Sequence, residues 1–185
     1  MRIITIITAL LFLTACFWGG QQGPAADTWL ELVERESFSI FLPINWQQVP
    51  ESELVNPSQW ELVLWYRSIE SRSGYFNNII ILRDENRLQE TDISLMNNNI
   101  NTLRLSLQSF DLIAEESLEL DGSREGKVIV FRGKYGTQTP EAHYIQTAIS
   151  CGESSYFLTI SIWNDLWDFT RYFPLLESFR CRNEW

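Results

Sequence analysis

The sequence predicts an α+β fold, a mainly antiparallel β-sheet packed with two main helices, as a single domain at residues 29–185. Most of the chain consists of short segments with alternating or continuous apolar residues, which are typical of strands. The connections between them are short and hairpin-like, which favours antiparallel pairing. Two stretches change to a spacing of three and four residues, which indicates helices that cover the sheet.

Four strands are expected before the first helix. They cover residues 29–36, 37–43, 60–69 and 75–83. The first is weak and the second ends at Pro43, after which Asn45–Trp46 form a turn. Residues 51–59, which contain Pro57, form a loop or a short turn of helix. The last two strands form a hairpin, and the run Ile79–Leu82 predicts a central strand buried on both faces.

A helix follows the fourth strand. One apolar stripe recurs at spacings of three and four and contains Ile93, Met96, Ile100, Leu103, Leu107 and Phe110. Asp92 is the candidate N-cap. The polar face is rich in asparagine, a mediocre helix former, so packing of the stripe must hold this helix.

Four further strands and a second helix complete the domain. The strands cover residues 112–120, 126–135, 141–151 and 155–163. Asp121–Gly122 is a strong hairpin signal. The last helix spans residues 164–179, and Pro174 either kinks it or starts a new turn. The expected order is therefore β-β-β-β-α-β-β-β-β-α.

The start of the chain has the features of a lipoprotein signal. Arg2 supplies positive charge, and the apolar stretch 3–14 is too short to span a membrane. Leu13-Thr14-Ala15-Cys16 resembles a bacterial lipobox. We expect residues 1–15 to be a signal peptide that is removed and Cys16 to carry lipid, including acyl chains such as palmitate. The alternative is a soluble secreted protein with a free Cys16.

Residues 16–28 are predicted to be a lipid-anchored flexible tether, because their glycines, alanines and Pro24 cannot build a packed core. The protein is then an exported, membrane-anchored lipoprotein on the extracytoplasmic side.

The three cysteines also fit this assignment. If lipid occupies Cys16, Cys151 and Cys181 remain as a pair, and export favours their oxidation to a disulfide. The alternative is two separate buried thiols. The formal net charge of −10 and the lack of any Lys/Arg cluster argue against nucleic-acid binding, so the lipid rather than charge is expected to contact the membrane.

Two segments resemble the PsbP/DcrB-like superfamily of small α/β sandwich proteins. They are FSIFLPINW at Phe38–Trp46 and LLESFR at Leu175–Arg180. Asn45 stands where that family usually has glycine, and the Cys151/Cys181 pair and the 50–57 loop also depart from its pattern. The superfamily includes photosystem-associated proteins and envelope lipoproteins, most without known catalysis. The resemblance thus implies a binding or accessory protein.

No catalytic, cofactor or metal site is expected. His143 is the only histidine, and the sequence lacks both a G-x-S-x-G elbow and a spaced Cys/His set. The adjacent acids Asp84–Glu85 and Glu115–Glu116 lie on predicted strands, where neighbours point to opposite faces. A solvated charged edge is the favoured interpretation of both pairs.

The aromatic surplus allows two interpretations. The residues concerned are Trp46, Trp60, Trp65, Tyr66, Trp163 and Trp167. They either pack the core, which is favoured, or line a groove for a peptide, glycan or hydrophobic ligand. Trp60 and Trp46 are the candidate partner contacts, and burial of both in one core would rule out the groove.

The leading hypothesis for function is a lipid-anchored accessory protein that binds another envelope protein without catalysis. One alternative is a hydrolase of envelope polymers that uses two carboxylates brought together by folding. The other is a small-ligand carrier that uses an aromatic groove.

Overall fold

The computed structural model describes the domain from Trp29 onward. The described ranges are 29–53, 60–72, 74–85, 89–137, 139–163 and 166–182. The predicted signal peptide at 1–15, the tether at 16–28 and Cys16 lie outside the described residues.

The strands of the described residues form two antiparallel sheets. The large sheet contains, in spatial order, β3 (Trp46–Gln48), β4 (Glu61–Arg72), β5 (Tyr75–Glu85), β9 (Ser154–Ile162), β8 (Ala142–Cys151), β7 (Arg124–Lys134) and β6 (Ser109–Leu120). The small sheet contains β1 (Leu30–Glu34), β2 (Phe38–Pro43) and β10 (Arg180–Cys181). Every strand pair is antiparallel, which confirms the predicted fold class.

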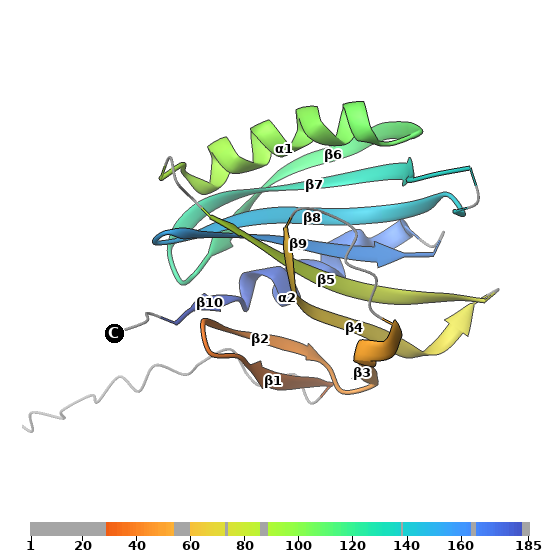
Figure 1. Ribbon diagram of the computed structural model, residues 1–185, viewed down its shortest axis with the longest axis horizontal. Coiled ribbons are helices and arrows are strands. Elements are labelled where there is room, and N and C mark those ends of the chain that lie inside the picture. Colours follow the sequence, from red (N-terminus) through yellow and green to blue (C-terminus); the bar gives the residue numbers. More distant parts are fainter. Residues whose placement is uncertain are drawn as a thin grey trace, which may run out of the picture.

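The domain has three layers (Figure 1). Helix α1 (Asp92–Ser106) covers one face of the large sheet, and the small sheet lies on the other side together with α2 (Phe173–Glu177). Alternation along β7 places Val130 in the core shared with the small sheet and Ile129 in the core beneath α1. Val130 and Ile129 are both fully buried, so the large sheet lies between two hydrophobic cores.

Helix α1 follows the predicted stripe only in part. Its N-cap is Thr91, whose side chain accepts a hydrogen bond from the Ser94 backbone N–H, so the assignment of the cap to Asp92 is wrong. The helix ends at Ser106, and Phe110 belongs to β6 instead. Ile93 is exposed.

The buried face of α1 carries a polar group that the apolar pattern does not reveal. Asn99 is buried and donates a hydrogen bond to Gln146 on β8, at 2.8 Å. Gln146 in turn donates to the Thr159 hydroxyl on β9, at 2.7 Å. Because each buried amide has a partner, this series of hydrogen bonds fixes the position of α1 along the sheet.

The second helix differs most from its prediction. Leu166–Tyr172 is a 3₁₀ segment (η2) interrupted at Asp168, and only Phe173–Glu177 is α-helical. Pro174 stands in the first turn of α2, where a missing N–H costs no hydrogen bond. The proline therefore starts a new turn, which is one of the two outcomes expected for it.

Two short strands were not expected. Trp46 belongs to β3 and pairs with Ser68, so it does not lie in a turn. Glu51–Glu53 form the 3₁₀ turn η1, in agreement with the short turn of helix that was one of the two alternatives for residues 51–59. Arg180–Cys181 form β10, which pairs with β2. The Asp121–Gly122 hairpin is confirmed, with both residues at positive φ (45° and 83°).

Candidate functional site

The main candidate site is a cavity of about 400 Å³ with aromatic walls, which we call the aromatic cavity. Its rings come from separate parts of the chain. They are Trp29 before β1, Trp46 on β3, Tyr75 at the start of β5, Trp163 after β9 and Tyr172 at the end of η2. Antiparallel pairing brings Trp46, Tyr75 and Trp163 to one end of the large sheet, because strand starts and strand ends alternate along that edge. Trp29 joins them from its place before β1 of the small sheet and Tyr172 from η2.

Local contacts hold the rings in place. The Tyr75 and Trp163 ring centroids lie 5.4 Å apart, and the Trp163 backbone N–H donates to the Asn77 side chain at 3.0 Å. The Tyr75 hydroxyl contacts the Ser161 hydroxyl. Burial raises the pKa of Tyr75, so its hydroxyl stays protonated at neutral pH.

Polar groups occupy the rest of the wall. They are Asn45, Ser68, Glu70, Asn77 and Arg171. Arg171 lies 4.8 Å from the centroid of the Tyr172 ring and donates a hydrogen bond to the Tyr172 hydroxyl at 2.8 Å. Glu70 and Arg171, the two charged residues of this wall, are both exposed. The cavity thus combines ring faces with hydrogen-bonding groups, as ligand sites commonly do.

Trp46 and Trp60 do not share a site. Trp46 is 7% exposed and belongs to the core under the small sheet, although it also lines the aromatic cavity. Trp60 is half-buried and packs against the core under α1, where it stacks on Phe157 with centroids 4.7 Å apart. The two tryptophans therefore do not lie in one core. Of the other named aromatics, Trp163 lines the same cavity as Trp46, and the Trp167 side chain lies outside the described residues.

Trp60 borders a second, acidic cavity of about 900 Å³ between α1 and the ends of β5 and β9. Its carboxylates are Glu61, Asp84, Glu85 and Glu90. Glu61 accepts hydrogen bonds from Arg83, and Glu90 accepts one from Asn98 at 2.8 Å. Within the described residues no cluster of three His, Cys, Asp or Glu side chains is arranged to hold a metal ion.

The other predicted polar candidates lie elsewhere. Asp84, Glu85, Glu115 and Glu116 are all exposed, in line with a solvated edge. His143 is buried on β8, and burial lowers its pKa, assisted by Arg132 and opposed by Glu141. It touches neither cavity.

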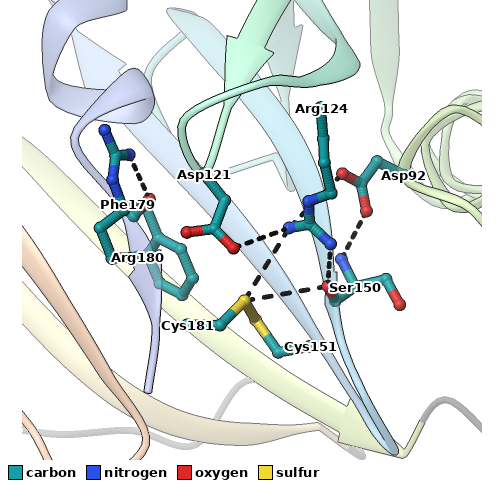
Figure 2. The surroundings of a disulfide bond; sticks show 8 residues. All are labelled: Asp92, Asp121, Arg124, Ser150, Cys151, Phe179, Arg180 and Cys181. Atoms are coloured by element: carbon teal, nitrogen blue, oxygen red, sulfur yellow. Dashed lines mark hydrogen bonds and ion pairs between the residues drawn. A yellow bond between two sulfur atoms is a disulfide. The ribbon is translucent and has the colours of Figure 1, made fainter. Parts of the chain in front are cut away.

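A disulfide joins the two sheets (Figure 2). Cys151 ends β8 and Cys181 lies on β10, and their Cα atoms are 5.7 Å apart. This is the pairing expected from the cysteine count. Arg124 lies beside the bond, where it donates to the Ser150 carbonyl at 2.6 Å and approaches the Cys181 sulfur at 3.8 Å.

Asp92 completes this cluster from the first turn of α1. Its carboxylate is buried and accepts a hydrogen bond from the Ser150 backbone N–H at 2.7 Å, and it lies 3.7 Å from Arg124. Burial raises the pKa of Asp92, and nearby Asp121 adds to this effect. The Ser150 N–H and the Arg124 charge work in the opposite direction.

The raised pKa of Asp92 predicts a pH-dependent stability. Folded Asp92 holds its proton more tightly than unfolded Asp92, whose pKa is about 3.9. Unfolding therefore releases protons in the window from about pH 4 to the raised pKa, and the contribution of Asp92 to stability falls as pH rises through that window. The difference in free energy of unfolding between wild type and Asp92→Asn, obtained by urea unfolding across this pH range, measures this contribution. The contributions of the other carboxylates are the same in both proteins and cancel in the difference. A constant difference between the two proteins contradicts the prediction.

No helix among the described residues has the length and apolar character needed to cross a membrane.

Comparison with known proteins points to the fold. No protein-family model matches the sequence, and no curated protein sequence matches it either. Cyanobacterial PsbP (CyanoP) from Synechocystis sp. PCC 6803 is similar with a TM-score of 0.58 and 16% identity, over 88% of this chain and 98% of that one. PA94 of Pseudomonas aeruginosa, a protein of unknown function described as a putative regulator, has a TM-score of 0.50 and 12% identity, over 78% and 89% of the two chains.

The Saccharomyces cerevisiae Ran-binding protein Mog1p also has a TM-score of 0.50, with 10% identity over 77% of this chain and 81% of that one. At such identities these are likenesses of fold. They agree with the resemblance carried by the opening strand and the closing LLESFR segment. The chain therefore shares its fold with cyanobacterial PsbP.

Proposed function

We propose that the protein is a lipid-anchored, exported accessory protein of the cell envelope that acts by binding and not by catalysis. The observation that carries the anchoring is the Leu13–Cys16 lipobox, at the end of an apolar stretch too short to span a membrane. Acyl chains on Cys16 supply the membrane contact that an acidic domain, of formal net charge −10, does not obtain from anionic lipid.

Two observations support binding as the activity. The aromatic cavity presents ring faces and hydrogen-bonding groups at one end of the sheet. One protein of the same fold, Mog1p, is named for binding another protein, Ran. The partner proposed here is another component of the envelope, and nucleic acid is disfavoured by the acidic charge.

Cys16→Ser tests the anchor. We expect the wild-type protein to incorporate labelled palmitate and to sediment with membranes, and the variant to lose the label and at least about 90% of its membrane recovery, because no acyl chain remains to insert. Labelling followed by membrane fractionation measures both. The matched control is Cys151→Ser/Cys181→Ser, which keeps Cys16 and therefore keeps the label. Equal membrane recovery of wild type and Cys16→Ser contradicts the proposal.

A second candidate function is a small-ligand carrier, which the aromatic cavity favours directly. The hydrolase alternative finds less support, because Glu61 and Glu90 in the acidic cavity are each engaged by a neighbouring side chain. A carrier releases its ligand unchanged. Chromatography of a bound ligand before and after incubation with the protein distinguishes it from a hydrolase.

A further inference from the structure

The aromatic cavity can be assigned a class of ligand from its walls. Trp29 is 41% exposed, and Tyr75 and Trp163 are half-buried, so their rings are partly open. The volume of about 400 Å³ lies in the lower part of the range for small-molecule sites, ~300–1,000 Å³. A ligand of one or two small rings fits such a space.

The charges in the wall disfavour a charged ligand. Glu70 and Arg171 carry opposite charges, so the wall as a whole has no excess of either sign. The formal net charge of −10 opposes an anion such as a phosphate ester. The Arg171 guanidinium lies against the Tyr172 ring, so a cationic ligand cannot use that ring face. A wall with one charge of each sign suits an uncharged ligand.

The polar groups favour a ligand with many hydroxyls. The amides of Asn45 and Asn77 can each donate and accept hydrogen bonds, and the Glu70 carboxylate accepts them. The aromatic rings offer flat apolar faces beside these groups. A pyranose ring has the matching surface, because one face presents C–H groups and its rim presents hydroxyls. A peptide that binds by strand addition would need a row of free backbone groups along the cavity instead.

We infer that the aromatic cavity binds a sugar unit of a neutral envelope glycan, with Trp29 and Trp163 as the stacking rings and Asn45, Asn77 and Glu70 as hydroxyl partners. This inference rests on the proposed function for access to envelope glycans. It goes beyond that function in naming the ligand class and the residues that recognise it.

Chitotriose, a neutral oligomer of N-acetylglucosamine, is a suitable probe. Isothermal titration uses the full membrane-extracted chain in a detergent without sugar groups. We expect saturable binding with a Kd that rises about fivefold to tenfold in Trp29→Ala, because the exposed stacking face is lost. Trp29→Phe keeps an aromatic face and restores part of the affinity.

The matched control is Trp60→Ala, which removes a tryptophan outside the aromatic cavity and leaves the Kd unchanged. Lack of saturable binding to chitotriose, or equal weakening in both tryptophan variants, overturns the inference. Competition by tri-alanine also overturns it, in favour of a peptide site. Palmitate labelling of the same preparation reports the anchor separately, so loss of sugar binding with intact labelling rejects the ligand and not the anchor.

Discussion

Replacement of Cys151 and Cys181 together by serine is expected to lower the free energy of unfolding by about 3–4 kcal/mol. The disulfide closes a loop between residues 30 positions apart and so removes entropy from the unfolded chain. It also links β8 of the large sheet to β10 of the small sheet, and β10 is only two residues long. Urea unfolding under oxidising conditions measures the loss.

Reduction provides the control for this pair. Dithiothreitol should destabilise the wild-type protein to the level of the double serine variant and should leave the variant itself unchanged. If wild type and variant unfold at the same urea concentration under oxidising conditions, the bond does not contribute to stability. A difference that persists in dithiothreitol would instead assign the effect to packing of the two sulfur atoms.

The second large effect is expected for Asp92→Ala, which should cost about 2–3 kcal/mol. The substitution removes the acceptor of the buried Ser150 backbone N–H and one of the two carboxylates near Arg124. The cost stays below that of breaking a fully buried ion pair, because the Arg124 side chain is 38% exposed and water can solvate it. Urea unfolding at neutral pH measures it.

Asp92→Asn separates the hydrogen bond from the charge. Its amide oxygen can still accept from the Ser150 N–H, and the neutral group avoids the desolvation that raises the pKa of Asp92. We therefore expect Asp92→Asn to retain most of the wild-type stability. An equal loss in the alanine and asparagine variants would assign the main effect to the Arg124 ion pair.

Much of the large sheet could be predicted because its strands alternate in a period that the sequence displays. Val128 and Val130 point to one core and Ile129 and Phe131 to the other, as the alternation indicates. The Asp121–Gly122 turn was also readable, because its positive φ angles select these residue types. Such features depend on residues that are neighbours in the sequence.

The missed features depend on distant residues. The strand β3 is three residues long and exists because Trp46 meets Ser68, which the local sequence does not reveal. Asp92 and Asn99 break the apolar stripe of α1, yet both are buried because Ser150 and Gln146 on β8 satisfy them. Burial of polar groups follows from partners and not from periodicity.

The sequence predicted only which aromatic residues were candidates for a site, and not which of them the fold brings together. Trp46 and Trp163 were identified as aromatic candidates, and the fold places them around one cavity. Trp60 was considered for the same groove as an alternative to core packing, but the large sheet separates its core from that of Trp46. Trp29, Tyr75 and Tyr172 were missed. A weak signal existed for Trp29 and Tyr75, which each begin a predicted strand, whereas Tyr172 lies inside the predicted helix at 164–179.

The stacking of Phe38 on Phe179 sets the order in which the parts of the domain can fold. Their ring centroids lie 5.1 Å apart, although one residue stands near the start of the domain and the other near its end. A chain emerges from the ribosome with its amino end first, so β1 and β2 must wait for the last residues before their core can close. Nascent chains cut short before Phe179 should therefore remain sensitive to protease, however much of the large sheet they already contain.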